Sequence, residues 1–267
     1  MIITGKIFAT KKEEIDYLVK HNKEIIEFKK AVVKHTTPTT TDKESCSTFK
    51  ALSTSKEHDT DNVIKRTVIG NTYNWLDSHG DVHLDGTFGK SISERQNKIW
   101  HLHDHEQKIT AKVGIPSKIY EENVAWSDLG IKKAGTTTAL MMDSDIRKDY
   151  NNLIFQEYKD GNIDQHSVGM YYVKIDFAVN DKDHKEEFKT WNDNIEKIGN
   201  REKAEELGYF YAVKEAKLVE ISAVLQGSNE LTPTIEAKDI EPEKSTQPEP
   251  EQSTQKINNN LRNNFLI

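Results

Sequence analysis

Large apolar residues are spread unevenly along this chain of 267 residues, and their distribution limits where a folded core can form. Residues 36–62 carry almost no large apolar side chain, and residues 233–267 are rich in Pro, Glu, Ser, Thr and Gln. Such segments bury too little apolar surface to fold alone. We therefore expect a flexible linker at 36–62, a folded domain at 63–232 and a disordered acidic and polar tail at 233–267.

The N-terminal region, residues 1–35, is predicted to form a short strand and then an amphipathic helix. Ile15, Leu18, Ile25 and Ile26 recur at roughly helical spacing. This helix is expected to dock on the body of the protein or on a partner.

The overall composition narrows the function classes. Charged residues make up 30% of the chain, and no run approaches the roughly 20 apolar residues that a membrane helix requires. The net charge of −7 argues against a general nucleic-acid-binding surface. The single cysteine excludes a disulfide within the chain and a cysteine-based zinc cluster.

The region 63–232 contains strand-like and helix-like segments, so an α+β class is expected. The predicted strands cover residues 63–70, 98–104, 111–115, 166–179 and 209–225. One helix is predicted between a cap at Asp143 or Ser144 and a stop at Gly161, and a second over about 182–207, ending at Gly208.

The segment "DQHSVGMYYVKIDFAV" shows strict alternation of residue type, which predicts a long strand with one nearly continuous apolar face. Ser167 lies at the entrance of this strand and is a candidate nucleophile. Gly169 would allow a backbone or a substrate to approach closely. Alternatively, Ser167 simply ends the turn before the strand.

A serine hydroxyl needs a neighbouring base, usually a histidine, which is itself held by a third group. The segment "IWHLHDH" and its surroundings offer His101, His103, His105 and His166. Glu220 lies within a predicted core strand, where an acid is costly unless it is paired. Asp104 is poorly placed to hold His103, because adjacent strand residues point to opposite faces.

Four segments resemble a known family. "LHDH", "HSVGM" and "LVEISAVLQGSN" are similar to the histidine, serine and acidic boxes of the tailed-phage prohead maturation serine proteases, which are related to herpesvirus assemblin. "WLDSHGDVHLDGTFGKSI" resembles an early block of the same family. The resemblance covers residues 66–232. It departs from the family at "KIT", where Pro-Ile-Gly is common, and at "QGSN", where Pro-Ala-Asn is common.

The resemblance implies a fold, a site and a biological role. The fold would be a mainly antiparallel β-barrel flanked by helices. The triad would be Ser167 as nucleophile, His103 as base and Glu220 as orienting acid, without cofactor or metal. Because assemblin uses a histidine as third member, His101, His105 or His166 remains an alternative to Glu220.

The implied substrates are the major capsid protein, the scaffold segment and the protease's own ends, cleaved in the host cytoplasm inside the assembling procapsid. The portal is a further candidate partner, and a homo-oligomer is compatible with the family. Neither a membrane nor a specific nucleic acid is expected as partner.

Two other functions compete with this one. In an extended strand His101, His103 and His105 would share a face and could bind zinc. "HLHDH" is one residue shorter than the His-x-His-x-Asp-His signature of metallo-β-lactamase-type hydrolases. The chain could also be a non-enzymatic capsid scaffold or assembly protein, a role that its helix, linker and acidic tail would suit.

Overall fold

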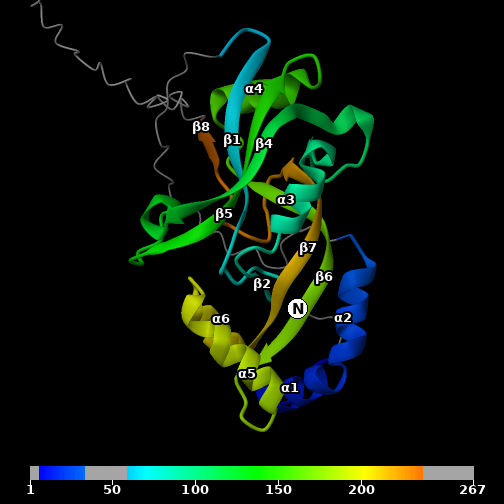
Figure 1. Cartoon of the computed structure of the whole chain (residues 1–267), viewed down its shortest axis with the longest axis vertical. Coiled ribbons are helices and arrows are strands. Elements are labelled where there is room, and N and C mark those ends of the chain that lie inside the picture. The colour runs from blue at the N-terminus through cyan, green and yellow to red at the C-terminus, as the bar shows by residue number, and fades with distance from the viewer. Residues whose placement is uncertain (1–5, 34–58, 237–267) are drawn as a thin grey trace, which may run out of the picture.

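The computed structural model describes residues 6–33 and 59–236. Within them the chain is α+β, with one mixed sheet of eight strands and six α-helices (Figure 1). No helix in these two stretches is long and apolar enough to cross a membrane. The expected linker and tail lie almost entirely outside the described residues. Residues 234–236 of the expected tail form a short strand, which contradicts the disorder expected for these positions.

The strands are β1 (Val63–Thr72), β2 (Asp81–His83), β3 (Trp100–His103), β4 (Lys112–Ala125), β5 (Thr136–Arg147), β6 (His166–Val179), β7 (Tyr209–Ala223) and β8 (Thr234–Glu236). The helices are α1 (Lys11–Lys20), α2 (Asn22–Ala31), α3 (Gly89–Arg95), α4 (Asn152–Asp160), α5 (Lys185–Asn194) and α6 (Arg201–Leu207).

Strand β7 organises the sheet. It pairs with β6 along its length, and its other edge pairs with β2 near its start and with β3 near its end. The sheet then continues in the order β3-β4-β5-β1-β8. The β2–β7 and β3–β7 pairs are parallel, and the other pairs of named strands are antiparallel. The sheet is not closed, so the expected barrel is not shown.

All five predicted strands are present, but β5 falls partly where a helix was expected to begin. Successive side chains of β5 point to opposite faces of the sheet, and Leu140, Met142 and Ile146 on one face are fully buried. Helix α4 begins later than expected, at Asn152, where the Asn151 side chain accepts a hydrogen bond from the backbone N–H of Ile154. The helix ends, as predicted, at Gly161, which has a left-handed conformation with φ of 77°.

The strict alternation predicted for β6 does not hold. Irregularities in its pairing with β7 lie between Gly169 and Met170 and on both sides of Lys174. A β-bulge adds one residue and reverses which face the following side chains occupy. Tyr171 and Val173 are consequently exposed, so the expected continuous apolar face is interrupted.

The long helix expected at 182–207 is two helices, α5 and α6. Between them the chain passes close to two tryptophan rings. A Cβ at Gly199 would lie 2.5 Å from the Trp126 ring and 2.8 Å from the Trp75 ring. This close approach leaves no room for a side chain at residue 199, which lies in the segment between the two helices.

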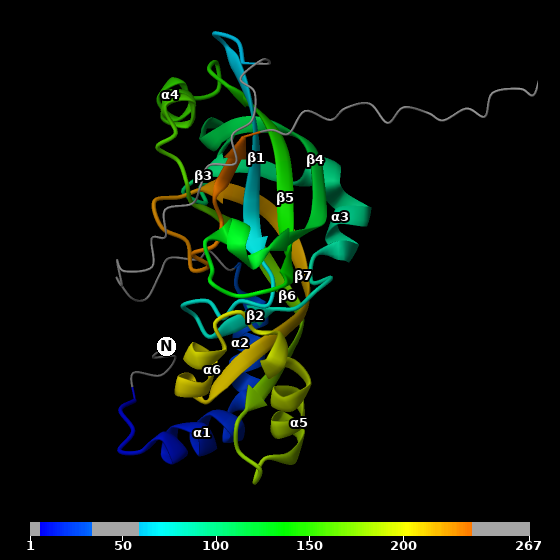
Figure 2. The ribbon, with the colours of Figure 1, turned by 90° about the vertical axis from the view of Figure 1, so that its left-hand side faces the viewer.

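The N-terminal helices pack on the body of the protein, beside β6 and the end of the β6–β7 ribbon (Figures 1 and 2). The expected single helix is broken at His21 into α1 and α2. Ile15, Leu18 and Ile25 are buried in the main core. Lys29 of α2 is buried and forms an ion pair with buried Asp81.

Candidate functional site

Strands β6 and β7 bring Ser167 and Glu220 to one face of the sheet. Ser167 lies directly opposite Ser222, and Gly169 directly opposite Glu220. Directly opposed residues of an antiparallel pair project on the same face, with Cβ atoms roughly 5 Å apart. Glu220 and Ser222 share that face because they are two positions apart on β7. Ser167 and Glu220 are therefore diagonal neighbours on that face, a relation for which the spacing is roughly 7–8 Å.

Glu220 is completely buried, and other side chains hold both of its carboxylate oxygens. Oε1 lies 2.7 Å from Nδ1 of His105, and Oε2 accepts a hydrogen bond of 2.5 Å from the Ser222 hydroxyl. A carboxylate only accepts, so Nδ1 of His105 carries the proton and the lone pair of the neutral ring is on Nε2. This is the tautomer that a base paired with an acid requires.

An unusual turn carries His105 to Glu220. Asp104 and His105 have φ angles of 50° and 56°, in the left-handed region that side chains other than glycine rarely adopt. Two hydrogen bonds to β7 hold the turn: the Asp104 N–H donates to the Ala223 carbonyl, and the His105 N–H donates to the Ser222 hydroxyl. Such strain persists only where surrounding contacts enforce it, and it is common at functional sites.

The structure does not bring His103 to Glu220. His103 is the last residue of β3 and pairs with Ala223, so it belongs to the opposite face from Glu220. Its Nδ1 instead lies 3.1 Å from the carboxylate of Asp104. The expectation that Asp104 is poorly placed to hold His103 is wrong, because the strand ends at His103 and the turn brings the two side chains together.

Gly169 makes room for the carboxylate of Glu220. A Cβ at this position would lie 2.0 Å from Oε1 of Glu220, closer than any real contact. We expected Gly169 to admit a backbone or a substrate, but the side chain of the neighbouring strand fills the space. The Ser-Val-Gly segment thus supplies both the candidate nucleophile and the space that the acid occupies.

His101 and His166 are buried behind the site. The two rings are joined by the hydroxyl of Tyr158, 3.0 Å from Nε2 of His101 and 2.8 Å from Nε2 of His166. Burial lowers the pKa of His101 well below its ordinary value and the pKa of His166 to about 4, so both rings are neutral at neutral pH. Neither ring contacts Glu220 in the described structure.

A small cavity beside Ser167 has room for roughly one water molecule. The Asn229 Oδ1 accepts from the Leu231 N–H, so its Nδ2 faces Asn71 Oδ1 and marks that atom as an acceptor. His83 Nδ1 therefore donates to Asn71 and, because burial lowers the pKa of His83, its Nε2 is an acceptor. The Asn71 Nδ2 is a donor. Asn71 and His83 both line the cavity, so they offer it one donor, Asn71 Nδ2, and one acceptor, His83 Nε2. A donor and an acceptor together suit a water molecule better than an oxyanion, which needs donors only.

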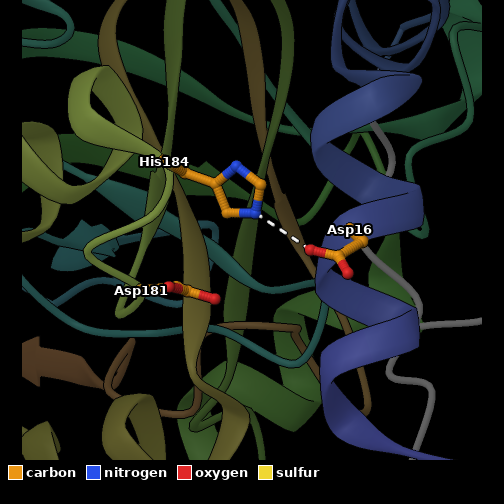
Figure 3. A group of neighbouring side chains, drawn as sticks. All are labelled: Asp16, Asp181 and His184. Atoms are coloured by element: carbon orange, nitrogen blue, oxygen red, sulfur yellow. Dashed lines mark hydrogen bonds and ion pairs between the residues drawn. The ribbon is translucent and has the colours of Figure 1, made fainter.

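The zinc site considered for "HLHDH" does not form. Its three histidines have separate partners, namely Ser144 and Tyr158 for His101, Asp104 for His103 and Glu220 for His105. In the described parts of the chain, the group with metal-ligand spacing is Asp16, Asp181 and His184 (Figure 3).

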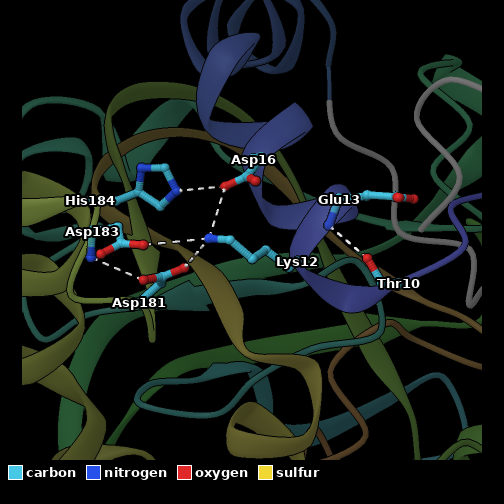
Figure 4. A network of polar contacts seen from close by, with 7 residues as sticks. All are labelled: Thr10, Lys12, Glu13, Asp16, Asp181, Asp183 and His184. Carbon is cyan, nitrogen blue, oxygen red and sulfur yellow. Dashed lines mark hydrogen bonds and ion pairs between the residues drawn. The ribbon is translucent and has the colours of Figure 1, made fainter.

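A lysine ammonium occupies that second group. Lys12 Nζ lies 3.7 Å from an oxygen of Asp16, 3.4 Å from Asp181 and 3.5 Å from Asp183 (Figure 4). The same carboxylates, Asp16 first, raise the pKa of Lys12. His184 also contacts Asp16, at 3.1 Å. We interpret the cluster as a surface ion-pair network that links α1 to the loop before α5.

Comparison of the chain with protein-family models, with characterised proteins and with solved structures found no match. The functional argument therefore rests on the residues and on their geometry.

Proposed function

We propose that the chain is a serine endopeptidase with Ser167 as nucleophile, His105 as base and Glu220 as the acid that orients the base. The observation that carries the proposal is the buried His105–Glu220 pair, at 2.7 Å, on the face to which Ser167 belongs. The proposal retains two of the residues expected from the sequence and replaces His103 by His105.

The chemistry follows from the tautomer of His105. The Ser167 oxygen would attack the carbonyl carbon of a peptide bond while its proton passes to Nε2 of His105. The imidazolium is stabilised by Glu220 and returns the proton to the leaving amine, which yields an acyl-enzyme. Water then attacks the ester with His105 again as base, releasing the acid and restoring the Ser167 hydroxyl.

The proposed biological role is maturation of a tailed-phage prohead, and the similarity of the four sequence boxes supports it. The substrates would be the major capsid protein, the scaffold segment and the ends of the protease itself, inside the assembling procapsid in the host cytoplasm. The assemblin-like barrel belongs to this proposal, since the described sheet shows only its α+β character and mainly antiparallel pairing.

Co-expression with the capsid protein of the same genome tests the proposal, with intact mass as the readout. Wild type should shorten the capsid protein, whereas Ser167→Ala and His105→Ala should leave it at full length. The matched control is His103→Ala, which removes an imidazole two residues away and should retain most of the cleavage. Cleavage by Ser167→Ala would exclude the serine mechanism. Loss of cleavage in His103→Ala, together with retained cleavage in His105→Ala, would identify His103 as the base instead.

A further inference from the structure

A chain of buried hydrogen bonds runs behind the candidate site, on the other face of β7. His101 and His166 lie beside Ile221 and Ala223 of β7, which alternate with Glu220 and Ser222. The Tyr158 hydroxyl bridges the two rings, whose centroids are 6.2 Å apart. Helix α4 thus connects β3 and β6, two strands that do not pair with each other because β7 lies between them.

The hydrogen-bond geometry determines where each proton lies. His166 Nδ1 is 3.0 Å from the Thr232 carbonyl, which only accepts, so Nδ1 is protonated and Nε2 of the neutral ring accepts from the Tyr158 hydroxyl. The Tyr158 oxygen then accepts from Nε2–H of His101. His101 Nδ1, in turn, accepts from the Ser144 hydroxyl at 2.9 Å. Every donor in the chain meets an acceptor.

His166, the residue before Ser167, is also held through its backbone. Its N–H donates to Thr232, and its carbonyl accepts a 2.7 Å hydrogen bond from the Thr232 hydroxyl. The "QGSN" segment passes so close that a Cβ at Gly227 would lie 2.8 Å from the His166 carbonyl oxygen. Hydrogen bonds to Tyr158 and Thr232 therefore hold both the ring and the backbone of this residue.

We propose that Tyr158 and His166 are positioning residues that hold Ser167 and the turn carrying His105 in register across β7. This inference rests on the proposed function. β3 leads directly into the strained turn at Asp104 and His105, and β6 begins with His166 and Ser167, so both strands deliver reacting groups. The hydroxyl of Tyr158 is the atom that joins them. Misplacement of reacting groups by about 1 Å can lower a rate roughly 100-fold.

The test is Tyr158→Phe, assayed with a peptide that spans the capsid cleavage site mapped by intact mass. Active sites are counted by titration with a fluorophosphonate, which labels the nucleophilic serine, so that rates refer to folded enzyme. We expect kcat per titrated site to fall about 10-fold to 100-fold with KM within about 2-fold. A kcat within about 2-fold of wild type would overturn the inference.

Tyr172→Phe is the matched control, because it also removes a buried hydroxyl from a hydrogen bond, here one of 2.7 Å to Asp81. It should lower the melting temperature but leave kcat per site within about 2-fold. An equal fall of kcat in both variants would show that any loss of stability slows the enzyme, which contradicts a positioning role. Labelling of Ser167→Ala by the fluorophosphonate would instead refute the proposed function.

Nitrogen-15 NMR of the histidine rings examines the hydrogen-bond chain independently of activity. His166 should carry its proton on Nδ1 and His101 on Nε2 at neutral pH. Tyr158→Phe should change the Nε2 shifts of both rings, whereas Tyr172→Phe should leave them unchanged. The opposite tautomer at either ring would overturn the network on which the inference depends.

Discussion

Single residues around Glu220 show how a buried carboxylate is tolerated in this protein. An acid removed from water is costly unless hydrogen bonds satisfy it. His105 and Ser222 provide these bonds to Glu220, and Gly169 provides the space. Each of the three belongs to a different local structure, a turn and two strands, so the arrangement is sensitive to small changes in any of them.

Replacing Gly169 by alanine should therefore disrupt the site. The added methyl group would meet Oε1 of Glu220 at 2.0 Å and force the carboxylate away from His105. We expect at least a 100-fold loss of cleavage and a destabilisation of about 1–3 kcal/mol. Gly89→Ala is the control, because the nearest atom to its Cβ would be 4.0 Å away. Peptide cleavage and thermal melting are the measurements, and equal behaviour of the two variants would contradict the prediction.

His166 should make the protein acid-sensitive. Burial lowers its pKa from the ordinary 6.5 to about 4, so between these values the unfolded chain binds a proton that the folded protein does not. The stability that His166 confers is complete above about pH 6.5 and is lost as the pH falls toward 4. The total loss is about 3 kcal/mol, and the lowered pKa of His101 acts in the same direction.

Urea unfolding at several pH values between 7 and 4 tests this sensitivity. His166→Asn should be less stable than wild type at pH 7, and its stability should decline less steeply on acidification. Carboxylates titrate in both proteins, so the difference between the two curves isolates the histidine. Parallel curves would show that His166 does not have a lowered pKa.

At the scale of elements, α2 is an integral part of the folded protein. Its Lys29 ammonium is buried against Asp81 and lies 4.1 Å from the centre of the Tyr211 ring, and Tyr172 donates a second hydrogen bond to Asp81. A charge pair of this kind is costly to break, because the remaining charge has no water to solvate it. The apolar face expected to dock on the body or on a partner is occupied by the body.

Lys29→Met should accordingly destabilise the protein by about 3–5 kcal/mol, since it leaves the Asp81 carboxylate without its cation. Adding Asp81→Asn should recover part of this loss. The neighbouring Lys30 is the control: it pairs with the exposed Glu27 at 3.4 Å, and Lys30→Met should change stability by less than about 0.5 kcal/mol. Chemical denaturation measures the free energy of unfolding of the two single variants and of the Lys29→Met, Asp81→Asn double variant. Similar losses for Lys29→Met and Lys30→Met would argue against a stabilising role of the buried Lys29–Asp81 ion pair.

At the scale of the whole molecule, the candidate site lies where β3, β6 and β7 meet, and the N-terminal helices pack near the far end of the β6–β7 ribbon (Figures 1 and 2). Both described stretches of the chain contribute to one main core. Removing the N-terminal helices would expose that core, so residues 6–33 are expected to remain with the folded body of the protein.

The C-terminal region is the better candidate for self-processing. Residues 237–267 are rich in Pro, Glu, Ser, Thr and Gln, a composition that suits a protease substrate. Intact mass of purified wild type should reveal species shortened after residue 236, whereas Ser167→Ala should keep all 267 residues. Full-length chains in both preparations would exclude self-processing while leaving cleavage of the capsid protein open.

Local features of the sequence were sufficient to predict the α+β class, the five strands, which include those that carry Ser167 and Glu220, and the end of α4 at Gly161. These depend on side-chain periodicity, glycine conformation and short motifs, which act over a few residues. The helix expected from Asp143 failed because pairing with β1 and β4 makes residues 136–147 a strand. Such long-range pairing overrides local propensity.

Only the tertiary structure shows which of the three histidines contacts Glu220. In an extended strand His101, His103 and His105 would share a face, but hydrogen bonds from the Asp104 and His105 N–H groups to β7 hold two successive left-handed residues. That turn places His105 at Glu220 and leaves His103 with Asp104. Glu220 lies 115 positions from His105 along the chain. Sequence spacing cannot reveal their contact, because it depends on backbone conformations that only the neighbouring strand stabilises.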